Sequence, residues 1–354
     1  MFDLWKSDGT LPDCRDTTMS TGPNPTEAAP SDLQEYLRTR LSTDDRAELR
    51  TSVLPALIHA ISGVAAALRT SSHVTLVGSA NTFGDDQLNV DVLTEDIVRA
   101  ALARCPSITT ASSEEDPEEK PVHGAGREAS RTGELYTVAF DPLDGSSIIA
   151  ANWSVGTIVG IWDGATAVGQ EPARKQIAAI LGVLGPRTTA LVALRVPGST
   201  PSCFEVALAE DGSAELIRTD ISFDKPPFKT RYFAPANLRS AGEDERYMEL
   251  LSTYIRERCS LRYCGGLVPD IAHALCKGHG IYVSPVTAKS KAKLRRLYEL
   301  YPIALVIECA GGKAIDPATG KDILATPLGN TDERAGLVCG TAEEVELFKK
   351  VFEL

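Results

Sequence analysis

Short apolar stretches of strand length alternate with longer amphipathic stretches over the second half of this chain. The apolar stretches predict strands near 229–233, 261–263, 280–284 and 336–339. The amphipathic stretches predict helices near 243–258, 268–277, 292–309 and 341–352. Because each element has to bury an apolar face against another element, this alternation predicts a layered α/β architecture.

The first half of the chain begins with helices and then changes to strands. Its periodicity predicts helices near 32–41, 45–69 and 174–184, and a further helix that follows Asp85 and Asp86. Strands are expected near 107–112, 136–141, 156–162, 188–196, 203–209 and 213–218. Residues 1–30 show little periodicity and fit a flexible arm. We therefore divide the remainder into an N-terminal α/β half at 31–200 and a C-terminal α/β half at 201–354.

The charge of the chain limits its partners. It has 48 acidic and 36 basic residues and a net charge of −12. Because nucleic acids and anionic membranes are bound through Lys and Arg, we expect neither as a partner. The longest apolar stretch, Leu54 to Leu68, is interrupted by Pro55, His59 and Ser62 and fits a core helix. The first residues resemble neither a secretory signal nor a transit peptide, so we expect a cytoplasmic protein.

The octapeptide at 140–147, Phe-Asp-Pro-Leu-Asp-Gly-Ser-Ser, carries the strongest chemical signal. It follows an apolar strand, so Asp141 should stand at the carboxyl end, where α/β proteins bind ligands. Pro142 should force a turn that lets Asp144 face the same point, and two converging carboxylates suit a hard divalent cation. The following Gly-Ser-Ser offers backbone N–H groups to an anion. This combination fits metal-assisted phosphoryl transfer, although a serine-capped turn uses the same residues.

Three further polar clusters have ordinary structural interpretations, and two of them also have a functional one. The acidic run at 112–119 either gathers cations or forms a solvated loop. The acidic stretch at 84–91 either joins that site or caps the helix after it. Arg295 and Glu299, on a predicted helix with Lys293, ordinarily form a surface ion pair.

Taken together, these four clusters resemble the class I fructose-1,6-bisphosphatase family of the lithium-sensitive, Mg-dependent sugar phosphatases. The resemblance runs from about Asp45 to the C-terminus, and the octapeptide is a specific motif of that family. A closer similarity to the sedoheptulose-1,7-bisphosphatase branch rests on NTFGDDQLNVD at 81–91, APANLRS at 234–240, LRYCGGLVPD at 261–270 and SPVTAKSKAKLRRLYE at 284–299. The family implies a five-layer α-β-α-β-α sandwich and a homodimer or homotetramer.

The resemblance also implies a role for each matching residue. Two or three Mg²⁺ ions, or Mn²⁺, would be held by Asp86, Glu114, Asp141, the carbonyl of Leu143, Asp144 and Glu299. A carboxylate pair that activates the attacking water would consist of Asp91 and Glu115, one of which should titrate near neutrality. The scissile phosphate would lie on the N–H groups of Gly145, Ser146 and Ser147 in the N-terminal half. The C-terminal half would bind the sugar and distal phosphate through Asn237, Arg262, Tyr263 and Lys293, with Arg262 reaching across a subunit interface.

Two regulatory features of related enzymes are missing from the matching positions. The lysine-tyrosine pair and the arginine that hold AMP correspond here to Leu135-Tyr136 and Asp163. The redox-active cysteines of plastid enzymes correspond to Val74 and Ser79. We therefore expect no sensitivity to AMP or to dithiol reduction.

The resemblance predicts Mg-dependent hydrolysis of the 1-phosphate of sedoheptulose 1,7-bisphosphate, which gives sedoheptulose 7-phosphate and phosphate. A fructose-1,6-bisphosphatase or a dual-specificity enzyme is the alternative, and Ser284, in place of a phosphate-binding tyrosine, weighs against a pure fructose enzyme. An inactive metabolite-binding protein is disfavoured because every expected carboxylate is present. An inositol monophosphatase is disfavoured by the second set of phosphate-binding residues.

Overall fold

The computed structural model describes residues 32–42, 46–80, 86–124, 130 and 132–354, with only the backbone described at 77–80 and 86–87. The predicted arm at 1–30 therefore lies outside the described residues. The same holds for the side chain of the predicted ligand Asp86.

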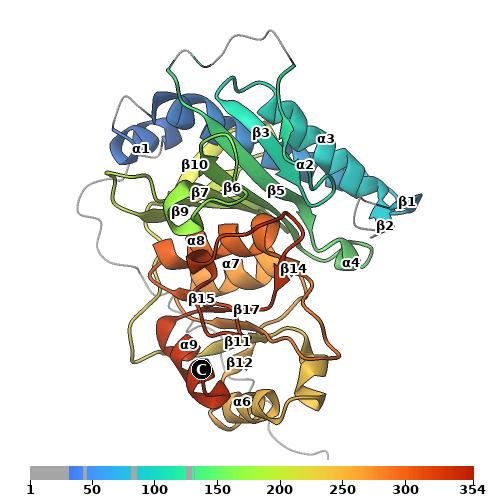
Figure 1. Cartoon of the computed structure of the whole chain (residues 1–354), viewed down its shortest axis with the longest axis vertical. Coiled ribbons are helices and arrows are strands. Elements are labelled where there is room, and N and C mark those ends of the chain that lie inside the picture. The colour runs from blue at the N-terminus through green and yellow to red at the C-terminus, as the bar shows by residue number, and fades with distance from the viewer. Residues whose placement is uncertain (1–31, 43–45, 81–85, 125–129, 131) are drawn as a thin grey trace, which may run out of the picture.

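Five layers stack along the long axis of the molecule (Figure 1). The outer layer on one side of an eight-stranded sheet consists of α1 (Leu33–Arg40), α2 (Leu54–Thr70) and α3 (Asn89–Leu102). The middle layer, between this sheet and a five-stranded sheet, consists of α7 (Leu267–Lys277) and α8 (Tyr301–Cys309). The outer face of the second sheet is covered by α6 (Glu245–Arg256) and α9 (Ala342–Phe352). The expected α-β-α-β-α sandwich is confirmed.

The first sheet has the strand order β10-β9-β8-β7-β6-β5-β3-β4. Its strands are β3 (Ile108–Ser113), β4 (Lys120–Pro121), β5 (Tyr136–Asp144), β6 (Val155–Asp163), β7 (Gln176–Leu184), β8 (Thr188–Leu194), β9 (Ser202–Leu208) and β10 (Ala214–Arg218). Neighbouring strands are antiparallel except β3 and β5, which are parallel. Because this sheet continues to Arg218, two of its strands lie beyond the division expected at residue 200, which stays a prediction.

The second sheet has the order β12-β11-β13-β17-β15. Its strands are β11 (Tyr232–Pro235), β12 (Ser260–Leu261), β13 (Ile281–Ser284), β15 (Lys313–Ile315) and β17 (Leu337–Gly340). Two separate strand pairs complete the described sheets, β1 (Leu76–Ala80) with β2 (Asp86–Leu88), and β14 (Leu294–Arg295) with β16 (Arg334–Ala335). The remaining helical segments are short: α4 (Ser146–Ile149), α5 (Pro172–Lys175), the π-helices η2 (Leu49–Val53) and η4 (Arg296–Leu300), and the 3₁₀ helices η3 (Leu238–Gly242) and η5 (Ile323–Ala325).

Two predicted helices are wrong in whole or in part. The stretch predicted as a helix at 174–184 forms the short α5 and then β7, a central strand of the first sheet. Helices cover both faces of this strand, so it has no polar alternation that would distinguish it from a buried helix. The helix predicted from residue 292 begins only at Arg296, because Leu294 and Arg295 pair with β16.

The segment Leu49–Thr70, formed by η2 and α2, is long and apolar enough to cross a membrane by length and composition alone. Half of its most apolar window is buried within the protein. Leu57, Ile61 and Val64 join the core between the outer helices and the first sheet. This burial is typical of the core helix that the sequence predicted.

The start of this long helix is tied to the strand that leads to the octapeptide. Glu134, which is buried, accepts the backbone N–H groups of Glu48 and Leu49 at 2.9 and 3.0 Å. Its carboxylate also accepts the hydroxyl of Tyr136, the first residue of β5, at 2.6 Å. Beside it, Arg46 donates two hydrogen bonds to Asp163, at 2.8 and 3.0 Å. A single buried carboxylate therefore caps the helix and fixes it to the central sheet.

Candidate active site

The parallel pairing of β3 and β5 brings two acidic segments to the same edge of the first sheet. Glu114 follows the last residue of β3, and its backbone N–H donates to the carbonyl of Phe140 at 3.0 Å. Asp141 is the next residue of β5. Since the carboxyl ends of parallel strands meet at one edge, Glu114, at the start of the acidic run, lies beside Asp141. Later members of the run bind elsewhere, since Asp116 pairs with Lys120 and Glu119 accepts the N–H of Ala167. The role of Glu114 in a metal site stays a prediction.

An irregularity in β5 places Asp141 and Asp144 in one environment. Side chains three residues apart point to opposite faces of a regular strand. Here the pairing of β5 with β6 shifts register between these residues, and Pro142 lies within the shift. The strand continues to Asp144, so the predicted turn is a local bulge in the strand. Asp141 also accepts the N–H of Leu143 at 2.9 Å, which orients its carboxylate.

Asp144 joins the two halves of the chain. Its carboxylate oxygens accept the N–H groups of Leu267 at 3.1 Å and Val268 at 2.7 Å. These are the first two residues of α7, so the carboxylate caps the start of a middle-layer helix. Burial raises the pKa of Asp144 to about 6, although the two N–H bonds act in the opposite direction.

Arg295, which the sequence predicted only as half of a surface ion pair, lies at this edge. Its side chain is 1% exposed and its guanidinium pairs with Glu114, with Asp332 3.7 Å away. Its backbone N–H donates to Glu299 on η4. The predicted surface ion pair between Arg295 and Glu299 is therefore wrong, because Arg295 precedes the helix and turns inward. Its position two residues after Lys293, within the matched stretch at 284–299, was the only available sequence signal.

The carboxylates of this edge are buried among like charges. Burial, and then the charges of Glu114 and Asp144, hold the pKa of Asp141 well above its usual range. Burial and the charge of Glu114 do the same for Glu299. Among the described residues no three His, Cys, Asp or Glu side chains are grouped closely enough to hold an ion as they stand. The donor set nonetheless fits a hard cation, since it offers only oxygen ligands and excess negative charge that Arg295 offsets in part.

Asp91 supports both interpretations of its cluster. It lies in the first turn of α3 and accepts the N–H of Leu88 at 2.8 Å, so it does cap the helix. It is also 3% exposed, and burial together with the charges of Glu115 and Glu114 raises its pKa to about 7. A carboxyl near neutral pKa next to Glu115 is what the predicted pair requires; its role in the reaction stays a prediction.

The residues predicted for the scissile phosphate follow Asp144 directly. Gly145 adopts a left-handed conformation with φ of +96°, which a residue with a side chain would strain to reach. This turn starts α4 at Ser146, and Ser146 and Ser147 are exposed. The structure thus brings the predicted N–H groups to the same edge as the acidic residues.

The predicted distal residues lie on the second sheet and on the segment before β14. Arg262 and Tyr263 follow the edge strand β12 and are exposed, and the Arg262 guanidinium stacks 5.6 Å from the ring centre of Tyr232. Lys293 is exposed immediately before β14. Asn237 differs from expectation, because its amide donates to Ser240 Oγ and to the carbonyl of Pro285, both at 2.7 Å. In this geometry it organises the loop and has no amide proton left for a phosphate.

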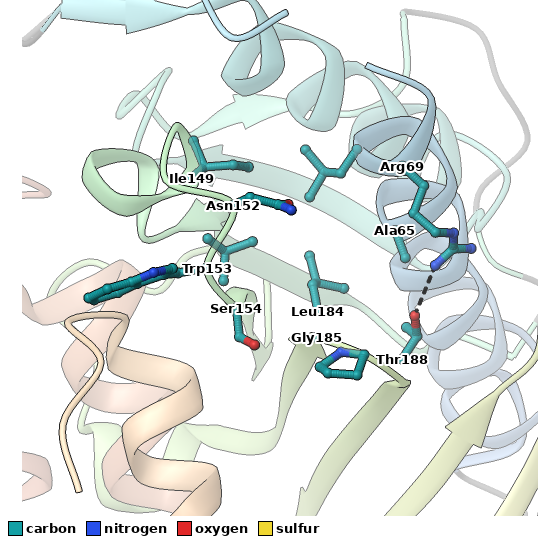
Figure 2. A pocket seen from close by; sticks show the side chains of 12 residues that line it. Ala65, Arg69, Ile149, Asn152, Trp153, Ser154, Leu184, Gly185 and Thr188 are labelled. Atoms are coloured by element: carbon teal, nitrogen blue, oxygen red, sulfur yellow. Dashed lines mark hydrogen bonds between the residues drawn. The ribbon is translucent and has the colours of Figure 1, made fainter. Parts of the chain in front are cut away.

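A separate cavity of about 370 Å³ lies beside α4 (Figure 2). The exposed indole of Trp153 forms one wall, and on another the guanidinium of Arg69 donates to Thr188 Oγ1 at 3.3 Å. None of the predicted site residues in the described part of the chain lines this cavity. It is therefore distinct from the candidate active site.

Two family models match the chain over most of its length. The model described as "Fructose-1-6-bisphosphatase, N-terminal domain" matches residues 36–208. The model described as "Fructose-1-6-bisphosphatase, C-terminal domain" matches residues 227–353. The chain belongs to the fructose-1,6-bisphosphatase family. The resemblance drawn from the sequence motifs is thereby confirmed.

Individual relatives within this family carry two substrate names. The chain is 37% identical to a chloroplastic sedoheptulose-1,7-bisphosphatase of Spinacia oleracea over 76% of this chain and 66% of the relative. It is 34% identical to a class 1 fructose-1,6-bisphosphatase of Syntrophotalea carbinolica over 89% and 92%.

The solved structures of relatives support the same assignment. A Toxoplasma gondii structure described as a candidate sedoheptulose-1,7-bisphosphatase superposes with a TM-score of 0.79 at 33% identity, and covers 92% of this chain and 99% of that one. A Leishmania major fructose-1,6-bisphosphatase in holo form gives a TM-score of 0.78 at 26% identity, over 92% and 100%. The layered fold is therefore that of the family.

Proposed function

We propose that this protein is a metal-dependent sugar bisphosphatase that hydrolyses the 1-phosphate of sedoheptulose 1,7-bisphosphate and releases sedoheptulose 7-phosphate. The observation that carries the proposal is the cluster of buried carboxylates at the joined ends of β3 and β5, directly followed by Gly145-Ser146-Ser147. A cluster of this charge repels a phosphate unless cations are present, so the site and a cation requirement belong together.

Mg²⁺ or Mn²⁺, two or three per site, is the cofactor that these donors fit. When bound by Glu114, Asp141, Asp144, Glu299 and the Leu143 carbonyl, it would polarise the phosphoryl oxygens and offset their charge. The chain's own groups supply the remaining functions. The N–H groups after Gly145 orient the scissile phosphate, and Asp91 with Glu115 accepts a proton from the attacking water. A pKa of about 7 suits a base that acts near neutral pH.

The size of the distal end supports the seven-carbon substrate. Sedoheptulose bisphosphate is one carbon longer than the fructose compound, so its distal phosphate needs more room. Ser284, at the end of β13, is smaller than the tyrosine at the matching position of fructose enzymes and keeps a hydroxyl. A six-carbon substrate would leave part of the polar pocket around Arg262 and Tyr263 unpaired, at a cost of about 1–3 kcal/mol. We expect roughly a ten- to hundredfold preference in kcat/KM for the seven-carbon substrate.

The deciding experiment measures phosphate release from both sugar bisphosphates in parallel, with Mg²⁺ and with a chelator. We expect activity on both substrates in Mg²⁺, a higher kcat/KM for sedoheptulose 1,7-bisphosphate, and none in chelator. A higher kcat/KM for fructose 1,6-bisphosphate would make the alternative correct. If neither compound releases phosphate, the proposed class of reaction is rejected.

A second subunit is also part of the proposal. Arg262 is exposed at the edge of the second sheet, between the exposed apolar side chains of Leu261 and Tyr263. On the adjacent helix α6, Met248 and Ile255 are 49% and 69% exposed. Exposed apolar side chains beside an arginine at a sheet edge, and others on the helix that precedes this strand in the chain, favour a protein interface. A homodimer, or a homotetramer built from it, would place Arg262 against the neighbouring site.

A further inference from the structure

One short segment of the chain connects the two phosphate-binding ends of the proposed site. Tyr263, at its start, is assigned to the distal phosphate of this subunit's own site, whereas Arg262 just before it is assigned to the neighbouring subunit's site. Leu267 and Val268, immediately after it, donate their N–H groups to the metal-site residue Asp144. The conformation of the segment at 263–266 therefore contributes to the distance between Tyr263 and Asp144, which belong to the two ends of one site.

Asp270 fixes the middle of this segment. It lies in the first turn of α7 and is 7% exposed. Its Oδ1 accepts the N–H of Cys264 at 2.8 Å, and its Oδ2 accepts the N–H of Gly265 at 3.2 Å. Hydrogen bonds from backbone N–H groups to a buried carboxylate are among the stronger ones in proteins. They hold the backbone just after Tyr263 in one place.

The segment is also packed against the elements that follow the scissile-phosphate residues. A Cβ atom on Gly265, where φ is +96°, would lie 3.5 Å from Ile148 of α4. A Cβ atom on Gly266 would approach the carbonyl oxygen of Ser154 to 3.2 Å. Gly265 is thus required by its positive φ, since its contact with Ile148 is an ordinary one, and Gly266 by the close approach of Ser154 and Pro269.

We propose that Asp270 is a positioning residue that sets the spacing between the two phosphate-binding ends, and through it the length of sugar the enzyme prefers. The proposal rests on the sugar bisphosphatase function. A bisphosphate has to satisfy both ends at once, so its binding depends on their spacing. A sugar monophosphate satisfies only the scissile end, and its binding is independent of that spacing.

The test is Asp270→Asn, which keeps the size of the side chain but replaces one accepting oxygen with an NH₂ group. One of the two N–H groups then loses its partner and the segment loosens. We expect KM for sedoheptulose 1,7-bisphosphate to rise roughly tenfold with kcat within about twofold. The kcat/KM ratio between the seven- and six-carbon bisphosphates should move toward one. The kcat/KM for fructose 1-phosphate, which lacks the distal phosphate, should be unchanged. A merely structural defect would instead lower kcat/KM for all three substrates.

Two further variants keep the test decisive. Gly265→Ala strains the same backbone without removing a buried charge, so it should give the same pattern even where Asp270→Asn does not fold. Asp211→Asn is the matched control, because Asp211 also accepts a backbone N–H, that of Ser213 at 2.8 Å, in the turn between β9 and β10.

The outcomes separate this proposal from the proposed function. An active wild type, with Asp270→Asn and Gly265→Ala retaining its KM and its chain-length ratio, would overturn the positioning role alone. A wild type that releases phosphate from neither bisphosphate would overturn both proposals.

Discussion

In the metal-free protein, the buried carboxyl groups at the edge of the candidate site bind protons more tightly than ordinary carboxyl groups do. Burial, with the charges of Glu115 and Glu114, raises the pKa of Asp91 from 3.8 to about 7, against the effect of the Leu88 N–H. Burial raises that of Asp144 to about 6. In the metal-free protein between about pH 4 and 6, both residues therefore carry protons that the unfolded chain has released, and near neutral pH Asp91 still does so in part.

This difference in proton binding predicts how stability depends on pH. An acid whose pKa is raised by folding binds more protons in the folded state. Its contribution to stability therefore falls as the pH rises from its pKa in the unfolded chain to its pKa in the folded protein. The window is from about pH 4 to 6 for Asp144 and from about pH 4 to 7 for Asp91. The test is urea unfolding in chelator at several pH values from about 5 to 7.5, which roughly span this window. The free energy of unfolding should decline less steeply with pH for Asp91→Asn than for wild type. Equal slopes would show that Asp91 titrates normally.

Asp141 is the residue whose substitution tests the metal site most directly. Its carboxylate is 3% exposed and lies among three other acidic side chains. Asp141→Asn removes one charge from the proposed ligand set and should lower kcat by several orders of magnitude while leaving the protein folded. Phosphate release and a thermal unfolding curve check the two parts of this statement. Near-normal turnover in a folded variant would remove Asp141 from the ligand set.

Among the helices and strands, the cap that Glu134 provides to the long helix has the clearest energetic consequence. Three donors converge on this buried carboxylate, the N–H groups of Glu48 and Leu49 and the hydroxyl of Tyr136. In Glu134→Gln an NH₂ group faces at least one of these donors, so the free energy of unfolding should fall by about 1–3 kcal/mol.

Denaturant unfolding measures this effect, and Glu48→Gln is its control. The Glu48 carboxylate accepts the hydroxyls of Ser130 and Thr132, which the oxygen of a glutamine can also accept. Glu48→Gln should therefore cost less than Glu134→Gln. The opposite order would show that Glu134 contributes little as a cap.

The hydrogen bonds at the start of the long helix also support the predicted insensitivity to AMP. Arg46 is held by Asp163, and the N–H groups at the start of the long helix are bonded to Glu134. A nucleotide phosphate would have to displace both interactions. Phosphate release measured during an AMP titration to millimolar levels should stay constant. Clear inhibition would show that a nucleotide site exists elsewhere in the protein.

Helices and strands could be predicted where the apolar periodicity was clear. The prediction failed where complete burial removes that periodicity. The ends of the amphipathic helices α6, α7 and α9 were predicted to within two residues. β7 was mistaken for a helix because all but one of its residues are buried, which leaves no alternation to detect.

The site shows the same limits as the elements. Asp141 and Asp144 followed from the strand end and the octapeptide, whereas the other acidic positions were expected from the family resemblance. The inward turn of Arg295 and the hydrogen bonds of Asn237 depend on contacts with β16 and Pro285, which lie far along the chain, so local periodicity could not predict them.

At the scale of the whole molecule, the placement of Arg262 predicts complementation between subunits. Arg262→Ala and Asp141→Asn should each be nearly inactive alone. If Arg262 serves the neighbouring subunit's site, a mixed dimer holds one doubly altered site and one intact site. Mixing the two variants should then restore part of the activity, with each variant incubated alone as the control. No recovery despite demonstrated subunit exchange would place Arg262 in its own subunit's site.

The hydrogen bonds between Asp144 and the start of α7 limit how the active site can open. Asp144 belongs to the first sheet, whereas Leu267 and Val268 begin a helix of the layer between the sheets. Rotation of the two sheets away from each other would pull these N–H groups off the carboxylate and leave it buried without partners. A hinge between the two halves is therefore an unfavourable entrance for substrate. We therefore expect the two sheets to keep their relative position while substrate enters and product leaves.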